Sequence, residues 1–283
     1  MKKISLIKGN IRIEFAIDRI KYIIGNNYEY KYRIKQLFNE YFSSTKDSDY
    51  SINNTGKIKL LVNDLQPIKR ETLYFSVNTN YSLSTDLKLT SKSLILKYLE
   101  ILLNKEEYYD TLNTINILLE AFSSEIDDHI ISTVFQTFSP KTLTKLITPL
   151  YLKEEEQANE YDMSYDEIIL FQLRMINYIA KHSYMNNIFI LLEIPYVSQS
   201  IKEYLNEIDH ALVIIITHQY YGSIDLKDIY LVDDQLLDLF DENTIYEIST
   251  LYGIYRLEEA KMKFKEIIEE KNLELELSIL RKL

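Results

Sequence analysis

Two uninterrupted apolar runs in the second half of the chain constrain its fold more than any other feature. Residues 188–192 read Ile-Phe-Ile-Leu-Leu, and residues 211–216 read Ala-Leu-Val-Ile-Ile-Ile. Runs of this kind are typical of parallel strands that are covered on both faces. Residues 198–208 lie between them and fit the crossover helix of a β-α-β unit. The second half of the chain therefore predicts part of a parallel sheet.

The first 90 residues also predict a mixture of strands and helix. Residues 11–15 alternate between apolar and polar side chains, which indicates a half-buried strand. Further candidate strands are residues 20–24, 58–62 and 72–77. After Gly25-Asn26-Asn27, apolar side chains recur at helical spacing over residues 28–42.

The middle of the chain has helical periodicity throughout. The candidate helices are residues 91–103, 108–122, 127–138, 141–151 and 165–181, and a long amphipathic helix is predicted over residues 257–280. The simplest arrangement is a discontinuous α/β domain of residues 1–90 and 185–283 with an all-helical domain, residues 91–184, inserted into it. Three consecutive small domains are the alternative.

Residues 25–32 have the outline of a phosphate-binding loop without the residues that make one work. A working loop has the pattern Gly-x-x-x-x-Gly-Lys-Ser/Thr between a buried strand and a helix. Gly25 and Lys31 are in register, but Tyr30 replaces the second glycine and Tyr32 replaces the hydroxyl that holds magnesium. Glu29 adds a charge that repels phosphate. The pattern therefore indicates a P-loop-NTPase-like fold with a degenerate loop, and a protein that binds without catalysis.

The net charge of −11 is unevenly distributed along the 283 residues. Residues 1–100 hold 17 Lys and Arg against 10 Asp and Glu, whereas the remainder holds 15 against 33. A split of this kind allows a basic face on an acidic protein. There is no cysteine, and no apolar stretch is long enough to span a bilayer, so we expect a cytoplasmic protein without membrane contact.

A longer stretch of the chain resembles a known family. It begins with Tyr-Asp-Met-Ser-Tyr-Asp-Glu-Ile-Ile at residues 161–169, continues with the amphipathic run to Lys181 and the apolar run 188–192, and goes on through the helix around residues 201–205 and the strand at 212–216. Residues 228–234, Asp-Ile-Tyr-Leu-Val-Asp-Asp, complete it. In these features the chain resembles the Csn family of subtype II-A CRISPR systems, mainly over residues 161–241. The helix predicted at residues 257–280 has no counterpart in the shorter members.

The resemblance implies a spacer-acquisition factor without enzymatic activity. Family members have an α/β head with a degenerate phosphate loop and an inserted helical leg. They form a homotetrameric ring, bind calcium and thread the ends of double-stranded DNA through a lysine-lined hole, without sequence preference. The expected partners are DNA ends, other CRISPR adaptation proteins and the RNA-guided nuclease.

A dense run of carboxylates gives the best metal candidates. Calcium takes six to eight hard oxygen ligands, and the resemblance around residues 165–167 favours calcium here. The candidate ligands are Glu160, Asp162, Asp166 and Glu167. The four histidines are not spaced like paired metal ligands, and no nucleophile–base set is recognisable.

The basic side chains of the N-terminal part are the candidates for DNA binding, because binding without sequence preference needs only cations that match phosphates. They are Lys2, Lys3, Lys8, Lys21, Lys31, Lys35, Lys57, Lys59, Lys69 and Arg70. Two other functions stay open: a nucleotide-dependent enzyme of the P-loop type, for which Lys31 is the supporting residue, and a structural interaction scaffold.

Overall fold

The computed structural model describes residues 1–43, 57–126 and 130–280, with side chains up to Leu273. Contacts between Cα atoms divide the chain into two compact units. The head unit comprises Met1–Thr79 and Tyr184–Leu283, and the leg unit comprises Asn80–Ser183. The structure thus places the first boundary at Thr79, where the sequence analysis places it at residue 90.

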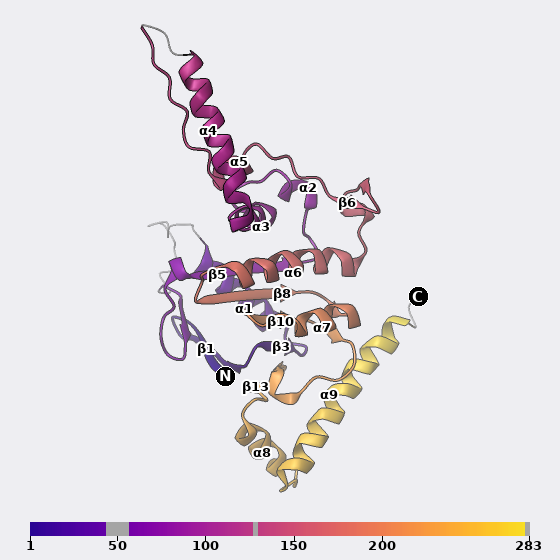
Figure 1. The fold of residues 1–283 in the computed structure, drawn as a ribbon. Helices are drawn as coiled ribbons and strands as arrows, with labels where there is room; N and C mark the ends of the chain where they lie inside the picture. Colours follow the sequence, from indigo (N-terminus) through magenta and orange to yellow (C-terminus); the bar gives the residue numbers. More distant parts are fainter. Residues whose placement is uncertain (44–56, 127–129, 281–283) are drawn as a thin grey trace, which may run out of the picture. The chain divides into compact units, whose positions relative to one another are not determined.

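A six-stranded sheet forms the centre of the head unit (Figure 1). Its strands follow the order β13-β12-β3-β10-β8-β5, and every neighbouring pair is parallel except β12 with β13. The strands are β3 (Ile20–Ile24), β5 (Thr72–Asn78), β8 (Asn187–Glu193), β10 (Leu212–Ile216), β12 (Ile229–Val232) and β13 (Leu236–Asp238). The apolar runs form β8 and β10, which pair in parallel as predicted. The fold is mixed α/β with a mostly parallel central sheet.

The helices of the head unit begin at residues that cap them. Helix α1 (Tyr28–Phe42) follows β3, and the Asn27 side chain accepts a hydrogen bond from the Tyr30 amide. Helix α7 (Gln199–Asn206) joins β8 to β10, and the Ser198 hydroxyl accepts from the Ile201 amide. The remaining elements are η1 (Lys69–Glu71), β9 (Tyr196–Val197), β11 (Gln219–Tyr220), η4 (Leu226–Asp228), α8 (Glu242–Leu251) and α9 (Leu257–Leu280).

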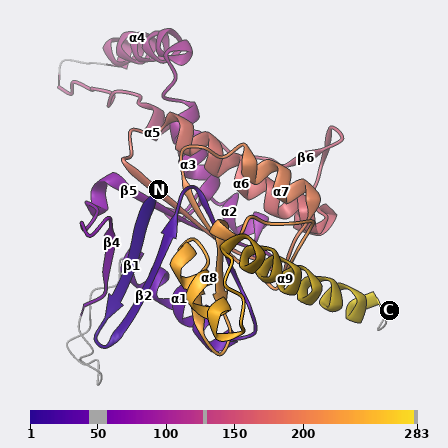
Figure 2. The same cartoon turned by 90° about the horizontal axis from the view of Figure 1, so that it is seen from below.

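A smaller antiparallel sheet accompanies the first one in the head unit. Its strands lie side by side in the order β2 (Ile11–Ile17), β1 (Lys2–Lys8), β4 (Lys59–Val62) (Figure 2). One apolar core joins Phe15 of β2, Phe38 of α1 and Phe189 of β8, so α1 packs between the two sheets. Burying such a side chain is worth about 1.5–3 kcal/mol. The strands β1, β12 and β13 are not among those predicted from the sequence.

The leg unit is mostly helical. Its elements are α2 (Leu83–Asp86), α3 (Leu94–Leu102), η2 (Glu106–Tyr108), α4 (Tyr109–Ile126), α5 (Pro140–Thr144), β6 (Leu152–Lys153), β7 (Glu156–Gln157), η3 (Glu160–Asp162) and α6 (Tyr165–His182). Ser93 caps α3 through the Leu96 amide, and Ser164 forms a capping box with Glu167 at the start of α6.

Two of the helix predictions in the leg unit are wrong. Of the helix predicted over residues 127–138, residues 127–129 lie outside the described residues and 130–138 are irregular. The β-branched residues of this segment favour extended backbone, and the Asn116 side chain binds both the amide and the carbonyl of Phe138. In the second predicted helix, residues 141–151, the helix α5 ends at Thr144. Pro149 disfavours the helical conformation of the residue before it.

Candidate functional site

The predicted phosphate loop lies at the centre of the parallel sheet. Residues 25–27 join β3 to α1, and β3 is flanked by β12 and β10. In open α/β sheets, ligands bind at the carboxyl ends of such central strands. The strand–loop–helix context predicted for residues 25–32 is therefore present.

Gly25 is required by the approach of β12 to the loop. Its φ angle is +118°, which side chains rarely allow. A Cβ atom at this position would lie 2.2 Å from the carbonyl oxygen of Val232 and 2.7 Å from its carbonyl carbon. The glycine thus permits close contact between two strand ends, and contributes to packing inside the protein.

Four backbone amides of residues 25–32 already have protein partners. In a working phosphate loop these groups point at the ligand. Here four of them donate within the head unit: Asn27 to the Val232 carbonyl (3.1 Å), Tyr28 to the Asn26 carbonyl (3.0 Å), Tyr30 to the Asn27 side chain (3.0 Å) and Lys31 to the Asn27 carbonyl (3.1 Å). A phosphate would have to displace these bonds, so the loop is not a preformed anion site.

Lys31 connects α1 to the end of β10. Its side chain is 3% exposed, and Nζ donates to the Thr217 carbonyl oxygen at 2.7 Å. Nζ also lies 3.3 Å from Nδ1 of His218. Burial lowers the pKa of Lys31 to about 8, although Asp233 opposes the shift. The pKa of His218 is lowered as well, by burial and then by the Lys31 charge. We therefore assign Lys31 a structural role.

The two tyrosines that replace the motif residues differ in environment. Tyr30 packs against the core of the head unit, whereas Tyr32 is 57% exposed. Glu29 pairs with Arg33 one turn along the helix at 3.0 Å. None of these three side chains resembles the serine or threonine hydroxyl that a magnesium ion requires in a phosphate loop.

A cavity of about 410 Å³ lies beside the loop. Its wall is formed by residues that follow β3, β10 and β12 and by helix α9, which contributes Ile268, Lys271 and Asn272. The Asn272 side chain bonds both the amide and the carbonyl of Tyr220, at 3.1 and 2.9 Å. Among the described residues of the wall, Lys271 carries the positive charge, and it pairs with Asp233 at 3.3 Å. This wall offers no uncompensated cation to a polyphosphate.

The structure buries two of the ten predicted DNA-binding residues. Lys21 is 0% exposed, and its Nζ binds Asp238 at 2.5 Å and the Lys227 carbonyl at 2.8 Å. Lys31 is buried as described above. Neither ammonium group can contact a DNA backbone in this conformation, because each is enclosed by its protein partners. We therefore correct the candidate set by removing both.

The other candidates lie nearer the surface, several in ion pairs. Lys3 pairs with Glu14, Lys8 with Glu40 and Lys35 with Glu193. Lys69 donates to the Tyr41 carbonyl and lies 4.5 Å from the centre of the Tyr41 ring. Lys57, Lys59 and Arg70 are exposed, and Lys2 is half-buried.

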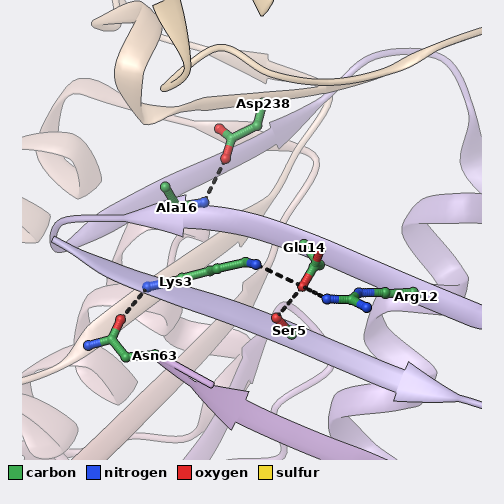
Figure 3. Close-up of polar contacts among 7 residues, drawn as sticks. All are labelled: Lys3, Ser5, Arg12, Glu14, Ala16, Asn63 and Asp238. Atoms are coloured by element: carbon green, nitrogen blue, oxygen red, sulfur yellow. Dashed lines mark hydrogen bonds and ion pairs between the residues drawn. The ribbon is translucent and has the colours of Figure 1, made fainter. Parts of the chain in front are cut away.

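A polar cluster on the small sheet holds one further cation that the sequence analysis missed (Figure 3). Glu14 accepts hydrogen bonds from Arg12 at 2.8 Å and Ser5 at 2.7 Å, and pairs with Lys3 at 3.2 Å. Arg12 is the largest cause that lowers the pKa of Glu14, to about 2. Further along β2, the Ala16 amide donates a hydrogen bond to the Asp238 carboxylate at 2.6 Å. The alternation of residues 11–15 placed Arg12 and Glu14 on one face and could have indicated this cluster.

The four predicted calcium ligands do not converge. Glu160 accepts from Ser84, Asp162 from the Asn159 amide, and Glu167 from the Ser164 amide and Lys153. Three of the four thus serve the caps and turns of the leg unit. Among the described residues, no group of three or more His, Asp or Glu side chains is arranged to hold a metal ion. The donor set in this chain does not fit a calcium site at these residues.

Comparison with solved structures found a protein of similar fold. No protein-family model matches the chain, and no curated protein matches it. Stu0660 of Streptococcus thermophilus is similar in structure, with a TM-score of 0.65 and 19% identity over 88% of this chain and 80% of that chain. At this identity the likeness shows the fold alone.

Two further structures are more distant. They are cbiO1 from Clostridium perfringens, part of the ABC transporter complex cbiONQ (TM-score 0.39, 10% identity, 88% of this chain and 94% of that chain), and the SmcHead bound to the C-winged helix domain of ScpA (TM-score 0.34, 12% identity, 77% and 89%). At TM-scores below 0.5 these two do not establish a shared fold. In the part of the chain that the structure describes, no helix has the length and apolar character to cross a membrane.

Proposed function

We propose that this chain is a non-catalytic protein that binds the ends of double-stranded DNA and acts in CRISPR spacer acquisition. We also propose that its head is a P-loop-NTPase-like scaffold. The observation that supports both is the loop of residues 25–32. It has the position of a phosphate loop, but its glycine, four of its backbone amides and its lysine serve contacts within the protein. The scaffold is then retained for its shape, as the resemblance to the Csn family implies.

The charge distribution supports DNA as the partner. The N-terminal part carries an excess of basic residues, and Lys57, Lys59 and Arg70 are exposed in the head unit. Cations of this kind bind phosphates without reading the sequence. A homotetrameric ring would multiply the modest set of one chain fourfold around the duplex.

Binding to linear and to closed-circular duplex of the same sequence tests the proposal. We expect binding to the linear form that weakens steeply with salt, because cations on the protein release counterions from the DNA. Ends are needed for threading, so the circle should bind much more weakly. Equal affinity for both forms would contradict end binding, and no binding of either at low salt would favour a structural scaffold.

Replacing single basic residues by alanine tests the proposed DNA-binding surface. Arg70→Ala removes a side chain that is 86% exposed, and each lost phosphate contact lowers the slope of log affinity against log salt by about 1. Lys263→Ala is a matched control, because Lys263 is exposed on α9 in the acidic part of the chain. Equal slopes for both variants would remove Arg70 from the surface we propose.

The oligomeric state and calcium are tested together. The ring predicts a tetrameric mass in solution, and the resemblance predicts that calcium supports it. Because Glu160, Asp162, Asp166 and Glu167 do not form a site within this chain, we expect their joint replacement by Asn and Gln to leave any calcium effect unchanged. Mass measured with calcium and with a chelator decides this. A monomer under both conditions would contradict the ring.

A further inference from the structure

The leg unit contains an aromatic cavity of about 390 Å³. Helices α3 and α6 and residues 149–151 form its wall. The aromatic and charged side chains of the wall include Tyr98 of α3, Tyr151, and Phe171, Arg174 and Tyr178 of α6. A volume of this size suits a small molecule, and nothing in the function proposed above uses it.

The four aromatic rings form two pairs. Tyr98 and Tyr178 lie 5.0 Å apart between ring centres at 63°, and Tyr151 and Phe171 lie 5.5 Å apart at 84°. Phe171 and Tyr178 are seven residues apart on α6, which places them on one face and separates them by about 10 Å along the helix axis. The pairs therefore stand at two ends of the cavity, with Arg174 between them along α6.

The core of the leg unit leaves this cavity open. Its apolar cluster contains three buried residues, Leu83, Ile95 and Met175, while Tyr98, Tyr151 and Phe171 are only partly buried. Empty apolar volume and exposed aromatic surface both reduce stability. A planar apolar group that fills the space would recover part of this free energy.

The charge at the cavity is positive. Arg174 is exposed and makes no ion pair or hydrogen bond with any described residue. The wall contains no Asp or Glu. A guanidinium group binds phosphate with two parallel hydrogen bonds and stacks on aromatic faces. The cavity therefore combines stacking surfaces for a planar ring with one cation for an attached anion.

We propose that this cavity binds a nucleotide, with the base against the aromatic pairs and the phosphate on Arg174. Bases stack on aromatic side chains in proteins that bind single strands, because every base has a flat π face. The same chemistry is offered by a free mononucleotide and by an unpaired nucleotide at the end of a DNA strand. The inference goes beyond the proposed function, which concerns duplex phosphates, and does not depend on it.

Calorimetric titration of the full chain with thymidine 5′-monophosphate, thymidine and a ten-residue oligothymidylate tests the inference. We expect saturable binding of the monophosphate and about tenfold weaker binding of thymidine, because a charge-assisted hydrogen bond to the phosphate is lost. Arg174→Gln should reduce the monophosphate to the thymidine affinity. Lys181→Gln, which removes an exposed charge at the end of α6 outside the cavity, should change nothing.

The three probes distinguish a free nucleotide from a DNA strand as the ligand of the cavity. Tighter binding of the oligothymidylate than of the monophosphate assigns the site to a DNA strand, and equal or weaker binding assigns it to a free nucleotide. No saturable binding of either probe overturns the inference, as does Arg174→Gln with wild-type affinity. Leu99→Trp fills the cavity and should abolish binding while the melting temperature shows that the chain is folded. Binding of linear duplex, measured on the same variants, reports the proposed function separately.

Discussion

The head and leg units each contain a cavity of about the same size, about 410 and 390 Å³, yet their polar groups are in opposite situations. Beside the phosphate-type loop, four backbone amides and the side chains of Lys31 and Lys271 have partners within the protein. In the leg unit, aromatic rings are partly exposed and Arg174 has no partner among the described residues. The position of a motif in the fold is therefore not enough to make a binding site. A binding site needs polar groups that lack a partner within the protein, because a ligand gains free energy only where the protein has not already supplied the contact.

The largest effect should come from Gly25→Ala. The new Cβ would collide with the backbone of Val232 at a φ angle of +118°, so we expect a loss of about 3 kcal/mol or more in the free energy of unfolding. Gly253→Ala is the matched control, since Gly253 has a φ angle of +79° but nothing within 4 Å of the added atom. It should lose about 1 kcal/mol. Denaturant unfolding measures both, and equal losses would contradict a packing role for Gly25.

The next effect concerns Lys31 as a structural residue. Lys31→Ala removes a buried side chain and leaves the Thr217 carbonyl without its donor, so we expect a loss of about 2–4 kcal/mol. Lys31→Met keeps most of the volume and should lose less. Any binding of ATP with magnesium should be the same in the wild type and in both variants in calorimetry, because Lys31 does not contribute to it. Tight binding to the wild type that disappears in Lys31→Ala would restore the nucleotide-dependent enzyme.

The pH dependence of the free energy of unfolding should show a smaller effect of Lys31. The pKa of Lys31 is lowered to about 8 in the folded chain from 10.5, so the unfolded chain binds more protons between these values. Stability therefore rises with pH from about 8 to 10.5 as the buried ammonium loses its proton. The rise should be about 1–3 kcal/mol and should be absent in Lys31→Met. Unfolding curves at pH 7.5 and 10 measure the difference, and parallel changes in both proteins would contradict it.

The smallest effect is expected in the leg cavity. Leu99→Phe adds apolar volume to the open wall and should raise stability by about 1 kcal/mol. Leu96→Phe is the control, because Leu96 is on the same helix α3 and does not line the cavity. A gain from Leu96→Phe equal to that from Leu99→Phe would show that the cavity is not the cause.

Strands with continuous apolar runs were the most predictable elements. The runs at 188–192 and 211–216 became β8 and β10, and 20–24 became β3 with the same bounds. The strand β1 was not predicted, because Lys2, Lys3 and Lys8 interrupt its apolar pattern, and the neighbours β2 and β4 rather than local propensity hold it in place. In the leg unit, helical periodicity over residues 130–138 was misleading, since the side chains of Asn116 and Ser123 of α4 donate hydrogen bonds to carbonyls of that segment in an irregular conformation.

The candidate site was located by sequence but not understood from it. The order of residues 20–42 placed Gly25 and Lys31 between a strand and a helix, which the structure has. That Lys21 and Lys31 are buried could not be predicted, because their partners Asp238 and Thr217 are more than 180 positions away in the chain. The aromatic cavity was missed for a similar reason: Tyr98, Tyr151 and Phe171 meet only when α3, α6 and the segment between them pack together.

The parallel strands, the strand–loop–helix unit at Gly25 and the absence of a complete phosphate motif can all be predicted from the sequence, since each depends on residues that are neighbours in the chain. The tertiary structure decided which charges remain available. Lys31 and Arg174 are both basic residues on helices, but Lys31 donates to the end of a strand that the sheet brings beside it, whereas Arg174 meets no acceptor among the described residues. Burial and long-range hydrogen bonds decide between these two outcomes, and both depend on contacts between distant segments.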